Sequence, residues 1–228
     1  MVHFFVLCVG LVLSLITSCF QEANATVFAS QAIQKPIVVQ KVKKLIVIDP
    51  GHGGADIGAK VQSVEEKMLA LKVALLVKRS LCDKGYCVVL TRTCDMLVPL
   101  NKRSAIANTT RSALFISIHF NACKGENVKG IEVYYYGKGA KWRQNASQKL
   151  AQAVLNSLIS ATNAPSRGVK KGNFYVIRNV CMPAILIEGG FLTNRQECNR
   201  LQDKIYIRKM AYSISEAIDT YFCSTYLN

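Results

Sequence analysis

Two histidines in this chain each follow a short apolar run of the kind that forms a buried strand. Residues 42–48 lead through Asp-Pro-Gly to His52, and residues 113–118 lead directly to His119. A third apolar run ends on Glu188. Sites in open α/β sheets form at the carboxyl ends of strands, so two imidazoles and a carboxylate at one edge indicate a catalytic metal, with zinc favoured. The alternative is two ordinary histidines and one buried, hydrogen-bonded glutamate.

Glu66 supplies a third donor for such a metal. It lies in the first turn of a predicted helix, where a carboxylate can face back toward the ends of the strands. Two histidines and one glutamate are a known catalytic zinc set, which leaves a fourth position for water. Glu188 would then act on that water as a general base. The competing interpretation makes Glu66 a helix-start acid favoured by the helix dipole, and its neighbour Glu65 could fill either role.

The order of predicted elements indicates a layered single α/β domain with a mostly parallel, twisted sheet of about six strands flanked by helices. Apolar runs bounded by turn residues predict strands over residues 42–48, 86–92, 113–119, 130–136, 174–178 and 184–188. Helical spacing predicts helices over residues 65–84, 99–110, 141–161 and 207–222. The apolar face of the first helix is expected to contain Met68, Leu71, Leu75 and Leu76.

The first 41 residues are interpreted as export and linker sequence. Residues 4–20 are continuously apolar and Ala23-Asn24-Ala25 is a small-residue cleavage pattern, so residues 1–25 are predicted to be a signal peptide. A second interpretation is a lipoprotein signal that ends before Cys19, which would be lipid-anchored. An uncleaved membrane anchor and a buried core helix remain as alternatives. Residues 26–41 form a polar linker, and the catalytic domain covers residues 42–228. Export places it in the periplasm or cell envelope.

The chain is strongly basic, with 29 Lys and Arg against 14 Asp and Glu and a formal net charge of +15. This charge favours a polyanionic partner: nucleic acid, an anionic membrane face or an acidic cell-wall polymer. No helix-turn-helix, zinc-finger or RNP-type pattern occurs, so no dedicated nucleic-acid binding is expected. A solvated basic surface is the alternative explanation of the charge.

Cysteine usage does not define a site. The chain has nine cysteines, and removal of Cys8 and Cys19 with the leader would leave seven. An odd number leaves at least one thiol unpaired, and no Cys-x-x-Cys pattern occurs. We interpret these cysteines as structural.

Four motifs, in this order, resemble the zinc N-acetylmuramoyl-L-alanine amidases of bacterial cell walls, of the amidase-3 type. They are DPGHGG at residues 49–54, EK at 66–67, SIHFNA at 117–122 and PAILIEGGFLTN at 183–194. The resemblance extends from residue 42 to about residue 222, which is nearly the whole predicted domain.

The resemblance implies that His52, Glu66 and His119 bind Zn²⁺ and that Glu188 is catalytic. It also implies the reaction, which is hydrolysis of the amide between the lactyl group of N-acetylmuramic acid and L-alanine of the stem peptide, by a zinc-activated water with a glutamate general base. Peptidoglycan is then the substrate, and cell-wall remodelling and daughter-cell separation are the roles. Asn121 is expected either to hydrogen-bond the substrate or to brace its loop. We expect a monomer, with membrane anchoring through the N-terminus left open.

Two departures and two competing functions accompany this resemblance. Phe120 stands where many relatives carry a small residue, and Gly189-Gly190 replaces the more usual Val/Thr-Gly or Ser-Gly; the sequence leaves open whether they alter the pocket. A zinc peptidase that cuts within the stem peptide would use the same metal chemistry. A non-catalytic wall-binding protein would have lost a ligand or Glu188, and none is lost.

Overall fold

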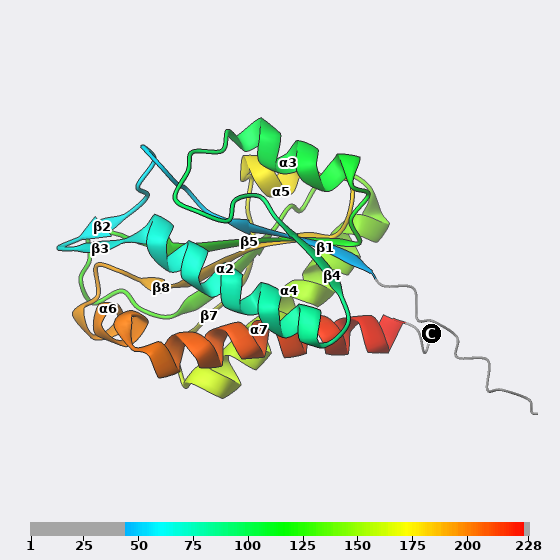
Figure 1. The fold of residues 1–228 in the computed structure, drawn as a ribbon. Helices are drawn as coiled ribbons and strands as arrows, with labels where there is room; N and C mark the ends of the chain where they lie inside the picture. Colours follow the sequence, from blue (N-terminus) through cyan, green and yellow to red (C-terminus); the bar gives the residue numbers. More distant parts are fainter. Residues whose placement is uncertain (1–43, 226–228) are drawn as a thin grey trace, which may run out of the picture. The chain divides into compact units, whose positions relative to one another are not determined.

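Six strands form one sheet in the part of the chain that the computed structural model describes, residues 44–225. Their order across the sheet is β4-β1-β5-β8-β6-β7 (Figure 1). Neighbouring strands run parallel except β6, which is antiparallel to β8. This mostly parallel sheet confirms the expected α/β class. The strands are β1 (Leu45–Pro50), β4 (Cys87–Leu90), β5 (Leu114–Asn121), β6 (Ile131–Tyr135), β7 (Ser166–Lys171) and β8 (Ala184–Phe191).

The helices cover the two faces of the sheet unequally. Three long helices, α2 (Glu66–Asp83), α4 (Lys141–Thr162) and α7 (Lys204–Thr225), lie on one face (Figure 1). The short helices α3 (Leu100–Thr109) and α5 (Tyr175–Arg178) lie on the other face. Two small elements complete the fold: α6 (Arg195–Gln202) precedes α7, and a hairpin of β2 (Lys60–Val61) and β3 (Val64–Glu65) leads into α2.

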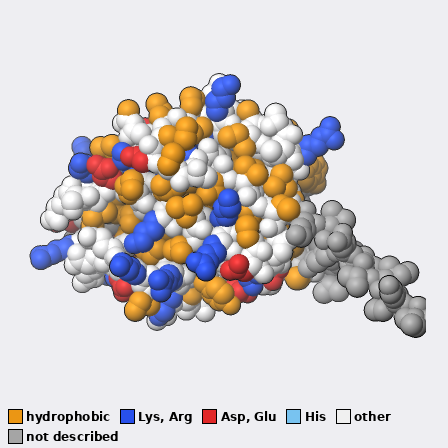
Figure 2. Space-filling view, in the orientation of Figure 1, with side chains coloured by type: hydrophobic (Ala, Val, Ile, Leu, Met, Phe, Trp, Pro, Cys, Tyr) orange, Lys and Arg blue, Asp and Glu red, His pale blue; other side chains and the backbone are white. Residues whose placement is uncertain are grey.

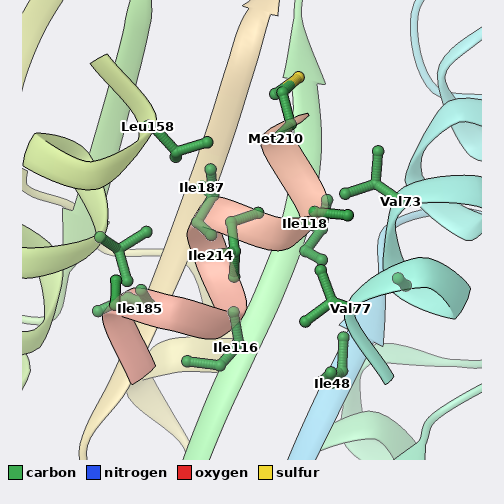
Figure 3. Packing of buried hydrophobic residues seen from close by; sticks show 14 of the residues in the cluster. Ile48, Val73, Val77, Ile116, Ile118, Leu158, Ile185, Ile187, Met210 and Ile214 are labelled. Carbon is green, nitrogen blue, oxygen red and sulfur yellow. The ribbon is translucent and has the colours of Figure 1, made fainter. Parts of the chain in front are cut away.

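The main hydrophobic core lies between the sheet and the three long helices. Alternate residues of β5 and β8 point toward this face, and Ile214 of α7 packs among them (Figure 3). Ile118, Ile187 and Ile214 are each at most 1% exposed. Burial of each such side chain stabilises the fold by roughly 1.5–3 kcal/mol. The alternation of core and opposite-face residues follows from the two-residue period of a strand.

The opposite face of β5 and β8 carries the polar residues of interest. Phe115 and Leu186 pack under α3 and α5 in a second, smaller cluster. One strand period beyond them come buried Ser117 and then His119, and Glu188 follows Leu186 in the same way. The short helices therefore cover the amino-terminal half of this face, and the site residues stand at the carboxyl ends of the strands.

One predicted strand is wrong. Residues 174–178 form the single-turn helix α5, in which Arg178 N donates to Phe174 O at 3.0 Å and Asn179 N donates to Tyr175 O at 3.0 Å. Aromatic and β-branched residues favour strands, but so short an apolar run does not decide between a strand and a helical turn. The sixth strand is β7, which the sequence pattern does not predict. It is a charged, glycine-containing edge strand, and charge on an edge prevents unwanted strand pairing.

The predicted buried face of α2 is also wrong in part. Met68 is 48% exposed and Leu75 is 41% exposed, whereas Leu69, Val73 and Val77 lie in the core. The helix is apolar around much of its circumference, so its sequence pattern does not single out one face. Figure 2 shows Lys and Arg side chains gathered with apolar ones over the outer side of α2 and α7. The exposed basic residues on these two helices include Lys72, Arg79, Lys204, Arg208 and Lys209.

The predicted signal peptide, the Cys19 lipid anchor and the linker of residues 26–41 lie outside the described residues. Among residues 44–225, no helix is long and apolar enough to cross a membrane. The seven cysteines of this part of the chain are all unpaired, and only Cys198 is buried.

Truncation of Ile214 to alanine should destabilise the fold by about 2–5 kcal/mol, because it opens a cavity between α7 and the sheet. Ile205→Ala is the matched control on the same helix, since Ile205 is 64% exposed. It should change the free energy of unfolding by less than about 0.5 kcal/mol. Denaturant unfolding of the two variants measures both values, and equal losses would contradict the described packing of α7.

Candidate metal centre

The structure brings together the three residues predicted to bind a metal. Glu66 Oε1 lies 3.0 Å from His52 Nε2 and 2.9 Å from His119 Nδ1. The imidazole rings are edge to face, with centroids 4.8 Å apart. One donor atom from each of the three residues falls within 4.8 Å of the others. His52, Glu66 and His119 form the only such group of His, Cys, Asp and Glu donors within residues 44–225.

Separate elements orient each donor. His52 follows β1 in a loop with φ of +58°, a conformation that a residue with a side chain adopts only where its surroundings enforce it. Its Nδ1 is hydrogen-bonded to Asp56 Oδ1 at 2.9 Å, which leaves Nε2 toward Glu66. His119 lies near the end of β5. Glu66 is the first residue of α2, and its carboxylate accepts hydrogen bonds from the backbone N–H of Ala59 at 2.8 Å and of Phe120 at 3.1 Å.

Two glycines make room for this cluster. A Cβ on Gly51 would lie 2.3 Å from the His119 ring. A Cβ on Gly58 would lie 2.5 Å from Glu66 Oε2 and 2.6 Å from the His52 ring, and Gly58 has φ of +65°. The three donor side chains therefore occupy space that only glycine leaves free at these positions.

Proximity sets the charge state of the cluster. Burial acts to raise the pKa of Glu66, but hydrogen bonds and charges of His119 and His52 outweigh it and hold the pKa well below its usual range. Burial acts to lower the pKa of His52, yet its contacts with Glu66 and Asp56 leave the pKa raised. Without a metal, Glu66 is thus an anion that shares its charge with two imidazoles.

This donor set fits zinc. Imidazole nitrogens and a carboxylate oxygen are the common ligands of catalytic zinc, and tetrahedral bonds of about 2.0–2.1 Å put ligand atoms roughly 3.3 Å apart. The observed separations of 2.9–3.0 Å from Glu66 Oε1 are close to that value. The Asp56 contact to the far nitrogen of His52 is the kind of support that a ligating histidine requires. The three residues therefore supply, within 4.8 Å of one another, the donor atoms that a divalent zinc ion takes.

Glu188 lies beside this cluster. It is the register partner of His119 across β5 and β8. Its carboxylate is buried, and its Oε2 has no hydrogen-bond partner among the described residues. Burial raises the pKa of Glu188 well above its usual range, and the charges of Glu66 and Glu132 add to that effect. A buried carboxylate with a free oxygen next to a candidate metal site is available to exchange a proton.

A pocket of about 220 Å³ opens on the α3–α5 side of the cluster. His52 and His119 form one wall, and the other walls are largely apolar. The apolar lining residues are Leu97, Val98, Pro99, Leu100, Phe174, Val176 and Leu186. The candidate centre is therefore bordered by an apolar cavity rather than by open surface.

Asn121 has protein partners in the structure. Its Nδ2 donates to Glu132 Oε1 at 3.0 Å, and its Oδ1 accepts from Ala122 N at 2.8 Å. These contacts fit the interpretation of Asn121 as a loop brace, while a contact with substrate stays a prediction. Glu132 was not identified from the sequence as a site residue. A carboxylate within the alternating strand pattern of residues 130–136 could have indicated it. Asp56, four residues after His52, was also missed.

The two sequence departures compensate each other in the core. Phe120 is fully buried, and a Cβ on Gly189 would lie 2.7 Å from its ring and 2.8 Å from Met210. The ring of Phe120 thus fills the space that a side chain at position 189 would occupy. Both positions point away from His119 and Glu188, so this pair does not line the pocket.

Comparisons with known proteins agree with this geometry. Residues 46–220 match the Amidase_3 family, described as N-acetylmuramoyl-L-alanine amidase. The sporulation-specific N-acetylmuramoyl-L-alanine amidase of Bacillus subtilis is 35% identical over 180 residues, which cover 78% of this chain and 68% of that protein. The crystal structure of N-acetylmuramoyl-L-alanine amidase from Clostridium difficile 630 has a TM-score of 0.76 at 36% identity, and the match covers 80% of this chain and 98% of that one.

A further solved structure is the CwlD amidase from Clostridioides difficile, determined in complex with the GerS lipoprotein. It matches with a TM-score of 0.75 at 28% identity, over 80% of this chain and 100% of that one. This chain belongs to the N-acetylmuramoyl-L-alanine amidase family, and it is a hydrolase that acts on an amide bond.

Substitution of Gly58 by alanine should weaken divalent-metal binding by about 10-fold or more, because the added methyl group displaces Glu66 and His52. Gly85→Ala is the matched control, since Gly85 also has positive φ, +87°, but a Cβ there meets nothing within 4 Å. Competition of each purified variant with a chromogenic zinc chelator gives the affinity. Equal affinities would show that backbone strain, and not crowding of the cluster, is what Gly58 avoids.

Proposed function

We propose that this chain is a zinc-dependent amidase that hydrolyses the bond between the lactyl group of N-acetylmuramic acid and L-alanine of the stem peptide. His52, Glu66 and His119 are its metal ligands, and Glu188 is its general base. The observation that carries the proposal is the convergence of two imidazoles and one carboxylate beside a buried glutamate whose Oε2 has no partner among the described residues.

The residues of the centre divide the chemistry between them. Zinc bound by the three ligands would polarise the scissile carbonyl and lower the pKa of a water molecule. Glu188 accepts the proton of the attacking water through its free oxygen and returns it to the amide nitrogen as the carbon–nitrogen bond breaks. The products are a lactyl carboxylate and the free amine of L-alanine. Asp56 keeps the His52 ring in the orientation that this arrangement needs.

The surroundings of the centre suit such a substrate. The apolar pocket between α3 and α5 can take the uncharged lactyl methyl group. We propose that the stem peptide extends toward β6 and β7. The high positive charge of the chain fits an acidic wall polymer.

We infer that the enzyme is exported, works on peptidoglycan as a monomer, and acts in cell-wall remodelling and daughter-cell separation. The sporulation-specific relative suggests spore formation as a further role for this enzyme. Because CwlD was solved in complex with the GerS lipoprotein, binding of a lipoprotein partner is a further property to test. Membrane anchoring through the N-terminus would keep it at the envelope.

The purified domain should contain about one equivalent of zinc, which is lost in His52→Ala and His119→Ala. Glu66→Gln should also lose it, because a carboxamide is a poor ligand. Glu65→Gln is the matched control, since Glu65 pairs with Lys60 and Lys67 instead of with the histidines. Elemental analysis after gel filtration measures the metal. Retention of zinc by both histidine variants would contradict the assignment of His52 and His119 as ligands.

Glu188→Gln keeps the shape of the side chain and removes the base. Zinc content should stay at the wild-type level, while turnover of purified peptidoglycan should fall by at least about 100-fold. Near-normal turnover would mean that another group takes the proton.

The bond that is cut separates the proposed function from its runner-up. Mass spectrometry of the wild-type digest should find stem peptides that begin with a free L-alanine amine. Fragments cut inside the stem peptide would instead identify a zinc peptidase.

A further inference from the structure

A buried carboxylate continues the row of site residues across the sheet. Glu132 on β6 is the register partner of Glu188 on β8, as Glu188 is of His119 on β5. The Glu132 side chain is 3% exposed. It accepts hydrogen bonds from Asn121 Nδ2 at 3.0 Å and from the Tyr134 hydroxyl at 2.7 Å. The candidate centre therefore extends toward β6 and does not end at Glu188.

Two cations of the edge strand β7 reach inward to this carboxylate. Arg167 Nε lies 3.0 Å from Glu132 Oε2, and Lys170 Nζ lies 2.5 Å from the same oxygen. Burial acts to raise the pKa of Glu132, but hydrogen bonds from Lys170, Tyr134 and Arg167 lower it, so Glu132 stays ionised. One anion faces two cations, which leaves about one positive charge uncompensated at the end of the row.

The guanidinium of Arg167 is held in a fixed plane. Its Nε is committed to Glu132, and its central carbon lies 5.0 Å from the centre of the Phe191 ring. Its two terminal nitrogens have no hydrogen-bond partner among residues 44–225, and the side chain is 34% exposed. Two parallel N–H groups on an oriented guanidinium form a fork that matches a carboxylate. The ammonium of Lys170, 37% exposed, lies beside the same anion and adds a second donor.

The distance between the Arg167 guanidinium and the metal centre indicates which substrate residue could reach the guanidinium. Adjacent strands lie about 4.8 Å apart, so a group above β6 is roughly 5–10 Å from Glu188. One extended residue spans about 3.5 Å. A peptide that leaves the metal centre toward β7 therefore brings its second or third residue to Arg167.

We propose that Arg167, assisted by Lys170, binds a free carboxylate on the stem-peptide residue that follows L-alanine. This inference rests on the proposed amidase function and adds a substrate preference to it. The enzyme then distinguishes stem peptides with a free carboxylate at that residue from those in which it is a carboxamide. Glu132 is a positioning residue, because it acts on the substrate only through the arginine that it orients. Protection of a sheet edge by charge is the competing explanation, and it entails no such preference.

The test uses the full zinc-loaded chain and two muramoyl peptides that differ only in a carboxylate or a carboxamide on the second residue. The wild-type enzyme should prefer the carboxylate by roughly 10-fold or more in kcat/KM, the size of a charge-assisted hydrogen-bond pair, mostly through KM. Arg167→Gln should abolish the preference. Arg167→Lys keeps the charge but not the fork, so it should retain only part of it.

Arg208→Gln is the matched control, because it makes the same charge change on the distant outer side of α7. It should keep the full wild-type preference. Calorimetric binding of the two free peptides that begin with L-alanine, on the same proteins, measures the Arg167 site even if neither amide is cleaved. Failure to cleave either substrate would then count against the proposed function alone. Equal binding of the two peptides by the wild-type protein, or a preference that survives in Arg167→Gln, would overturn the proposal for Arg167.

Discussion

The candidate centre depends on two buried arginines that hold the loop after β1 from beneath. Arg103 donates to the Asp49 carboxylate at 2.8 Å and to the backbone carbonyl of His52 at 2.6 Å. Arg92 donates to the carbonyls of Gly51 and Lys67, each at 2.7 Å, and so ties this loop to the start of α2. Burial lowers the pKa of Arg92, and the charge of Arg103 adds to that effect, so the Arg92 cation depends on its carbonyl acceptors. Loss of one partner of a buried pair costs about 3–5 kcal/mol.

The unequal covering of the sheet exposes the strand ends beside which this loop lies. The long helices cover one face and enclose the main hydrophobic core, while the two short helices leave the strand ends of the other face free. Side chains at matching register on β5, β8 and β6 then form a row in the order His119, Glu188, Glu132. The sheet makes this row nearly rigid, because β5, β8 and β6 each have a hydrogen-bonded strand on both sides. The loop and α2 need only bring His52 and Glu66 to one end of it.

The sequence predicted those parts of the structure that depend on local pattern. An apolar run that ends on a polar residue locates His119 and Glu188, and helical periodicity locates α4 and α7. The strand predicted at residues 174–178 was wrong because five residues carry too little periodicity to separate a strand from a helical turn. β7 was not predicted because its lysines and glycine are typical of a loop, and only its pairing with β6 makes it a strand. The contact between Arg167 and Glu132 follows from that pairing, across a bulge, and no local pattern reports it.

The contact between Phe120 and Gly189 also constrains how this site could have evolved. The residue that fits at each position depends on the residue at the other. An aromatic ring at position 120 excludes a side chain at position 189, and a small residue at position 120 beside glycine would leave a void. Substitutions in contact are not additive, so an ancestor could not have exchanged either residue alone without a loss of stability. Homologous chains should therefore fall into two groups at these positions, ring with glycine or small residue with side chain. A conservation score taken one position at a time would miss this constraint, because the constraint belongs to the pair of residues.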